Sequence, residues 1–100
     1  MIFDWDESKN AINQSKHGID FYEASSVFYD EMAILFDDPE HSEIEDRFII
    51  LGLSSQANIL IVCHCYREND NVIRIISARK ATKKEGDRYA KGIWYRQTQP

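Results

Sequence analysis

Basic side chains gather in one short segment near the C-terminal end of the sequence. Arg79 is followed by Lys80, Lys83 and Lys84. The lysines stand at the start of an expected helix, where free backbone N–H groups and the helix dipole already favour an anion. Arginine adds a planar fork of N–H groups that suits a phosphate group. The segment therefore predicts a site for a phosphate-bearing partner such as a nucleic acid.

Glu85 and Tyr89 lie four residues apart on the same expected helix, so their side chains project from one face. With Arg79 they would supply a cation, a carboxylate, and a hydroxyl group or stacking ring. Each also has a structural interpretation. Glu85 closes a capping box over residues 82–85, and Tyr89 would pack under the sheet with Ile93. The residue pattern leaves both interpretations open.

Four arginines fall at or within the expected strands, at positions 47, 67, 74 and 79. In an antiparallel sheet, the end of one strand and the start of the next meet at one edge. We therefore expect Arg67 and Arg74 to be close together, and Arg79 and Arg47 to lie nearer the opposite edge. Phosphate binding is one role for these side chains, and ion pairing with the acidic helices is the alternative.

His17 stands where the first expected helix ends, and the ordinary histidine pKa of about 6.5 suits acid–base work. Capping the negative end of that helix is the alternative role. His64 lies between Cys63 and Cys65 in an expected strand and is interpreted as a core residue. Strand alternation places its ring on the opposite face from the two thiols, so the three do not form a metal site. We expect no metal and no other cofactor.

Local signals predict two helices, then a run of strands, then a last helix. Asp6 caps a helix over residues 7–16, Gly18 ends it, and Asp20 caps a short second helix. Short polar turns between the apolar segments that follow favour antiparallel pairing. The expected strands are 32–36, 47–53, 58–67 and 72–79, and the last helix runs from the capping box to about residue 94. Residues 2–5 are a further short strand or a lead-in. The fold class is therefore α+β, with a four-stranded antiparallel sheet.

The composition is typical of one globular domain covering residues 1–100, with 43% hydrophobic and 29% charged residues. The apolar runs fall short of the roughly 20 residues of a membrane span, and the start lacks a secretory signal, so we expect a cytoplasmic protein with reduced cysteines. Residues 1–46 carry 13 acidic and two basic side chains, whereas residues 47–100 carry ten basic and four acidic ones. This asymmetry suits an anionic partner, or is a chance segregation of solvated charges.

Several segments together resemble the BrnT family of toxins. The most specific are Lys16-His17-Gly18-Ile19 and the eight residues 74–81, RIISARKA. Other matching positions are spread along the chain: Phe3-Asp4-Trp5-Asp6, Lys9, Asn13, Phe21, Ala24, Phe28, Asp30, Glu45-Asp46-Arg47, Gly52, Glu85 and Tyr89. The resemblance covers the chain to about residue 90.

This resemblance implies a RelE-like fold and a ribonuclease that halts translation, from a bacterial type II toxin–antitoxin system. It also implies a partner, a BrnA-like antitoxin that binds DNA, so that the toxin reaches operator DNA only within a hetero-oligomeric complex. RNA is the implied substrate. The competing interpretation is a catalytically silent module that binds such a partner for operon repression, which the net charge of −5 favours slightly.

A metal-independent ribonuclease lets the RNA 2′-OH attack the adjacent phosphate, which leaves a 2′,3′-cyclic end. The reaction needs proton transfer and cations that stabilise the transition state. We expect Arg79 with Arg67 or Arg74 to bind the phosphate, and Glu85 or His17 to transfer protons. Tyr89 would stack on a base or donate a proton. Further RNA contacts are expected from Arg74, Lys80, Lys83, Lys84 and Arg47.

Overall fold

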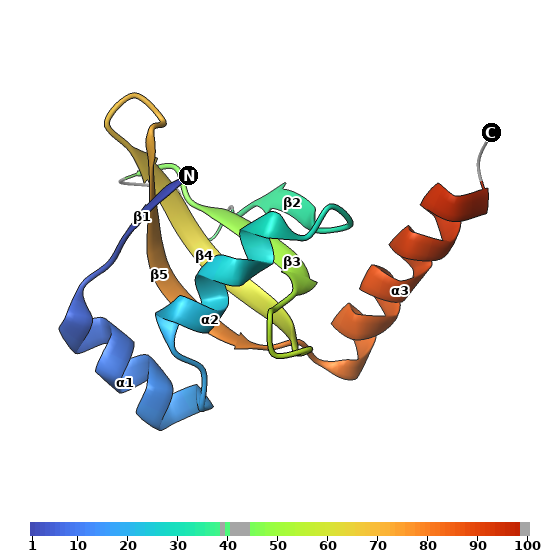
Figure 1. Cartoon of the computed structure of the whole chain (residues 1–100), viewed down its shortest axis with the longest axis horizontal. Coiled ribbons are helices and arrows are strands. Elements are labelled where there is room, and N and C mark those ends of the chain that lie inside the picture. Colours follow the sequence, from blue (N-terminus) through green and yellow to red (C-terminus); the bar gives the residue numbers. More distant parts are fainter. Residues whose placement is uncertain (39, 41–44, 99–100) are drawn as a thin grey trace.

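The computed structural model describes residues 1–38, 40 and 45–98 of the chain and places a five-stranded sheet at its centre (Figure 1). The strand order across the sheet is β1-β5-β4-β3-β2. The strands are β1 (Ile2–Asp4), β2 (Ile34–Asp37), β3 (Phe48–Leu53), β4 (Ile59–Arg67) and β5 (Val72–Lys80). Strands β2 to β5 form the expected antiparallel meander, and β4 lies inside the sheet between β5 and β3.

The N-terminal segment is a strand rather than a lead-in. β1 pairs in parallel with β5, with Ile2 opposite Val72 and Asp4 opposite Arg74. A parallel pair needs a long crossover, and here residues 5–71 lie between the two strands. The sheet therefore has a fifth, parallel strand beside its antiparallel meander, and the fold class is α+β as expected.

Side-chain caps define the two N-terminal helices, α1 (Glu7–His17) and α2 (Phe21–Ser26). The Asp6 carboxylate accepts hydrogen bonds from the amides of Ser8 and Lys9, and Gly18 ends α1 with a φ of 70° that favours glycine. Asp20 caps α2 by accepting from the amide of Glu23 at 2.8 Å. A single 3₁₀ turn, η1 (Val27–Tyr29), continues from α2.

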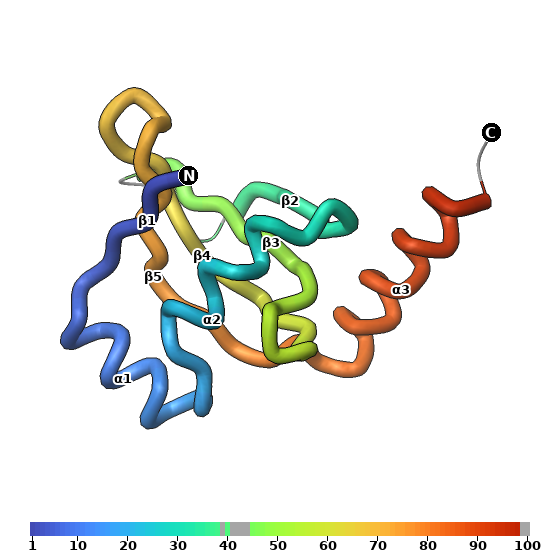
Figure 2. The backbone as a smooth tube through the Cα atoms, viewed as in Figure 1, coloured from blue at the N-terminus to red at the C-terminus, as the bar shows by residue number. Residues whose placement is uncertain are grey.

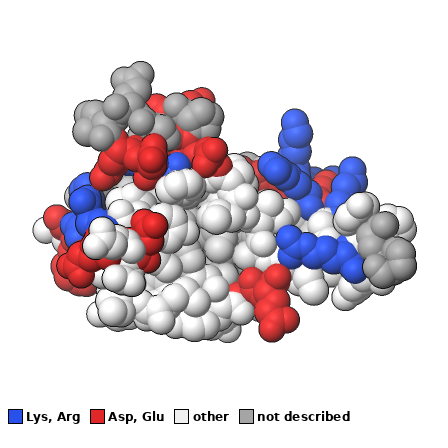
Figure 3. Space-filling model, turned by 90° about the horizontal axis from the view of Figure 1, so that it is seen from above, with Lys and Arg blue, Asp and Glu red and all other residues white. Residues whose placement is uncertain are grey.

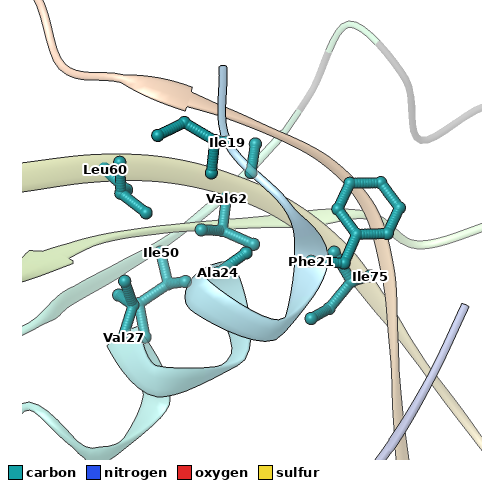
Figure 4. Close-up of a cluster of buried hydrophobic side chains, with 9 residues drawn as sticks. Ile19, Phe21, Ala24, Val27, Ile50, Leu60, Val62 and Ile75 are labelled. Atoms are coloured by element: carbon teal, nitrogen blue, oxygen red, sulfur yellow. The ribbon is translucent and has the colours of Figure 1, made fainter. Parts of the chain in front are cut away.

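The sheet buries an apolar cluster on each face, because successive strand residues point to opposite sides. On one face, α2 and η1 cover Ile50, Leu60, Val62 and Ile75 (Figure 4). On the other face, Leu51 and Ile61 pack with Tyr89 of the last helix, α3 (Lys83–Thr98). The backbone in Figure 2 shows α3 leaving the sheet after β5 and extending away from α1 and α2.

Helix α3 is four residues longer than the sequence predicts, although the glycines at positions 86 and 92 disfavour a helix. Tertiary contacts explain the difference. A Cβ at Gly92 would lie 3.4 Å from Ile34, so the helix passes close to β2 there, and the Arg96 guanidinium donates to the carbonyl of Glu31 at 3.2 Å. Within the described residues, no helix is long and apolar enough to cross a membrane.

The close approach of η1 to the sheet depends on Gly52. A Cβ at this position would lie 2.8 Å from Cγ1 of Val27 and 3.0 Å from Cβ of Ala33. We expect Gly52→Ala to lower the free energy of unfolding by about 1–3 kcal/mol, because those neighbours must shift. Gly86→Ala is the matched control: nothing lies within 4 Å of its Cβ position, and alanine in a helix should stabilise by about 0.5–1 kcal/mol. Urea unfolding of both variants tests this, and equal effects would contradict it.

Candidate active site

Arg79 and Glu85 form a two-pronged ion pair where β5 leads into α3. Arg79 Nη1 donates to Oε1 of Glu85 at 2.8 Å, and Nη2 donates to Oε2 at 3.0 Å. The same carboxylate accepts from the Thr82 amide at 2.8 Å, while the Thr82 hydroxyl accepts from the Glu85 amide at 3.2 Å. The capping box and the pairing with Arg79 are therefore both present, and one carboxylate serves both.

The electrostatics of this pair favour its charged form. The hydrogen bond from Arg79 is the largest cause that lowers the pKa of Glu85 to about 2, and the same contact raises the pKa of Arg79. A carboxylate with so low a pKa is a weak base near neutral pH. Glu85 is therefore suited to hold the guanidinium in place, while 41% of the Arg79 side chain stays exposed to a ligand.

Glu85 is also expected to make stability depend on pH in an acid window. Its pKa is about 2 in the folded protein against 4.5 for a free side chain, so its contribution is complete above about pH 4.5 and is lost as the pH falls towards about 2. Glu85→Gln should lower stability by about 1 kcal/mol at neutral pH. The gap between the variant and the wild type should then close on acidification. Denaturant unfolding at a series of pH values measures it, and a gap that stays constant would contradict the prediction.

Tyr89 packs under the sheet, as its structural interpretation predicts. Its side chain is 5% exposed and packs with Leu51 and Ile61, so the ring is not free to stack on an RNA base. The hydroxyl donates to Oδ2 of Asp30 at 2.5 Å. Burial, and then Asp30, raise the pKa of Tyr89 to about 12. The expected stacking role is therefore corrected: the ring anchors α3 on the sheet because it is enclosed by core residues.

Asp30 is the residue that the analysis of the sequence missed. Burial alone would raise its pKa, but hydrogen bonds from the Leu53 amide, the Tyr89 hydroxyl and the Met32 amide lower it overall. The carboxylate thus joins η1, β3 and α3. The sequence contains one indication of its role, because Asp30 is among the positions that resemble BrnT. Its contact with Tyr89 could not be predicted locally, because the two residues are 59 positions apart.

The other three arginines that the sequence places at or within the strands lie at the far end of β4 and β5. Arg67 and Arg74 are at neighbouring positions there, as expected, with Arg67 opposite Val72. Arg47 is also at this end, which corrects the prediction that it lies with Arg79. Because β3 runs antiparallel to β4, its start lies beside the end of β4, and Glu45 pairs with both Arg47 and Arg67 at 3.3 Å.

Arg79 and Arg67 therefore belong to different ends of the sheet. Arg79 is opposite Ile61, six residues before Arg67 along β4, which corresponds to about 20 Å of strand. Arg74 pairs with Asp4 of β1 at 2.6 Å. Arg74 lies five residues before Arg79 on β5, which corresponds to about 17 Å of strand, so the expected joint site separates into two clusters.

Helix α1 is fixed beside the Arg79 end of β5. Asn13 donates to the carbonyls of Ile19 and Ala78 at 2.8 Å each and accepts from the Ala78 amide at 3.1 Å. His17 lies one turn after Asn13 on this helix and is exposed. Lys80, Lys83 and Lys84 are also exposed, around the junction of β5 with α3. The structure therefore brings the α1 terminus and the lysines to the same end of β5 as Arg79.

His64 and Cys63 of the central strand β4 are unsuited to proton transfer near neutral pH. His64 is fully buried, and burial lowers its pKa to about 4, so its imidazole is neutral. Burial also raises the pKa of Cys63 to about 11. Both cysteines are free thiols. Among residues 1–38, 40 and 45–98, no group of three His, Cys, Asp or Glu side chains is arranged to hold a metal ion.

Comparison with known proteins identifies the family. Residues 5–85 match the family model described as "Ribonuclease toxin, BrnT, of type II toxin-antitoxin system". The fold is similar to the 1.1 Å crystal structure of the Brucella abortus ribonuclease toxin BrnT, with a TM-score of 0.63 and 24% identity, over 83% of this chain and 100% of that one. A search of curated proteins found no match. Because the family model covers most of the sequence, the chain belongs to the BrnT family of ribonuclease toxins of type II toxin–antitoxin systems.

Proposed function

We propose that the chain cleaves RNA without a metal ion, at a site built around Arg79 where β5 meets α3. The observation that carries this proposal is the exposed guanidinium of Arg79, which Glu85 holds by two hydrogen bonds. A cation whose position is already set costs no reorganisation when charge builds up on the reacting phosphate. The surrounding lysines at 80, 83 and 84 add positive potential for the RNA backbone.

The reaction is an internal transfer of the phosphoryl group. The 2′-oxygen forms a bond to the adjacent phosphorus, the bond to the 5′-oxygen of the next nucleotide breaks, and a 2′,3′-cyclic phosphate remains. The 2′-OH loses a proton and the leaving 5′-oxygen gains one. His17 is our candidate for proton transfer because an imidazole ring can both accept and donate a proton and α1 is fixed to Ala78, next to Arg79. Glu85 positions Arg79, and Tyr89 positions α3.

The biological role follows from this activity. Cleavage of RNA would inhibit translation in the cytoplasm, and a BrnA-like antitoxin would neutralise the toxin in a hetero-oligomer that reaches operator DNA through the antitoxin. The family description supports a protein antitoxin. The second candidate function is a silent module that only binds the antitoxin. The observation that favours it is the ion pair itself, because Glu85 already neutralises Arg79.

Incubation of the purified chain with single-stranded RNA in excess EDTA, with and without ribosomes, tests the proposal. We expect cleavage that EDTA does not stop, with products that end in a 2′,3′-cyclic phosphate. If RNA is cleaved only in the sample that contains ribosomes, the result would support the same chemistry on ribosome-bound RNA. Absence of cleavage in both tubes, together with harmless expression of the chain without antitoxin, would overturn the proposal in favour of the silent module.

A further inference from the structure

Helix α3 carries most of the exposed positive charge of an acidic protein. Lys83–Thr98 holds five basic and two acidic side chains, a net charge of +3, in a chain of net charge −5, so the remaining residues carry −8. One of the two acids, Glu85, is already paired with Arg79. Figure 3 shows several Lys and Arg side chains at the end of the molecule that α3 forms, whereas most Asp and Glu side chains lie at the opposite end, together with a smaller group of basic ones.

The exposed side of α3 combines basic and aromatic residues. Positions 84, 88, 91 and 95 follow the helical spacing of four, three and four residues, so they lie along one stripe, with position 94 beside it. We call this set the outer face of α3: Lys84, Arg88, Lys91, Trp94 and Tyr95. All five are exposed, with Trp94 at 67% and Tyr95 at 59%. The opposite side of the helix, by contrast, buries Tyr89 against the sheet.

Two large aromatic side chains that face solvent next to cations need an explanation. Core packing does not supply one, because the anchoring of α3 relies on Tyr89 and Ile93 on its other side. The family match does not supply one either, since it ends at Glu85 and four of the five outer-face residues lie beyond it. Lysines and arginines interleaved with exposed rings are the combination that holds single-stranded nucleic acid, by phosphate contacts and base stacking.

We propose that the outer face of α3 is a binding track for single-stranded RNA that leads away from Arg79. The inference deepens the proposed ribonuclease function and rests on it for the identity of the nucleic acid. Glu85 in the first turn of α3 holds Arg79. An RNA strand with a phosphate bound at Arg79 would therefore reach α3 at the beginning of the helix. The 16 residues of α3 then extend for about 24 Å. Unstacked bases are required for ring contacts, so a duplex should bind less well.

Binding of a 2′-O-methyl RNA strand of about 12 nucleotides tests the track apart from cleavage. This probe lacks the free 2′-OH that the proposed reaction uses. Trp94→Ala with Tyr95→Ala should weaken binding about 25-fold, or about fivefold for each ring, and should leave the salt dependence unchanged. Lys91→Gln should instead reduce the slope of log affinity against log salt by about 0.7, as expected for one lost phosphate contact on a single strand.

Matched control variants lie on the other helices. Tyr22→Ala removes a ring on α2 that is 66% exposed, and Lys9→Gln removes an exposed lysine at the start of α1, away from His17. Both should bind the probe as the wild type does. In a Trp5→Phe chain, Trp94 is the single tryptophan, so quenching of its fluorescence by the probe would report stacking directly. Circular dichroism of each variant verifies that it is folded.

The outcomes separate this inference from the proposed function. If the wild type cleaves RNA and the double aromatic variant binds the probe and cleaves equally well, the track is wrong while the ribonuclease stands. If the wild type binds the probe through Trp94 but cleaves no RNA, the track stands and the catalytic proposal fails. If the aromatic variant keeps its affinity for RNA and loses affinity for an antitoxin, the outer face is a protein-docking surface and the inference is overturned.

Discussion

Arg79→Ala is expected to lower the rate of RNA cleavage by about 10²–10³-fold. The Glu85 carboxylate holds the guanidinium by two hydrogen bonds at the junction of β5 with α3, and removing one preorganised group that stabilises transition-state charge has effects of this size. Single-turnover cleavage in excess EDTA measures the change. Arg79→Lys keeps the charge but loses the two-pronged contact, so it should recover only part of the rate.

A folding measurement and one further variant keep this prediction falsifiable. Removing Arg79 leaves the Glu85 carboxylate without its partner, so thermal unfolding must show that Arg79→Ala is folded at the assay temperature. Arg67→Ala removes an equal charge at the other end of β4, beside Glu45. A loss of cleavage in Arg67→Ala that exceeds the loss in Arg79→Ala would place the active site at that end of the sheet and overturn the assignment.

Asn13→Ala is expected to reduce the free energy of unfolding by about 3–4 kcal/mol. The Asn13 amide is buried and makes three hydrogen bonds, two of them with the backbone of Ala78 in β5. Alanine would leave the N–H and C=O groups of Ala78 and the carbonyl of Ile19 buried without this hydrogen-bond partner. Each unsatisfied buried group lowers stability by about 1–3 kcal/mol, and relaxation of the surrounding structure offsets part of the total. Such a loss is a large fraction of the stability of a domain of this size.

The control for Asn13 lies next to it on α1. Gln14 is exposed, and Gln14→Ala should change stability by less than about 0.5 kcal/mol. Urea unfolding of both variants, followed by circular dichroism, gives the comparison. Similar values for the two would mean that Asn13 does not fasten α1 to β5, and the argument that places His17 near Arg79 would lose its support.

The sequence alone determined the helices, the meander and the family. Asp6, Gly18 and the capping box at Glu85 are local signals, because a cap is made between residues a few positions apart. Short turns between apolar segments are equally local, and they set the order of β2 to β5. The motifs at residues 16–19 and 74–81 predicted the BrnT family, which the family match confirms.

Only the tertiary structure decided which side chains meet. Tyr89 is buried against Asp30 across 59 residues, Arg47 lies with Arg67 instead of Arg79, and β1 pairs in parallel with β5. These contacts depend on strand direction and on how α3 packs, which no short window of sequence encodes. Residue types in the sequence therefore identify candidate cations, but the packing of the sheet and α3 decides that Arg79 with Glu85 lies away from Arg47, Arg67 and Arg74.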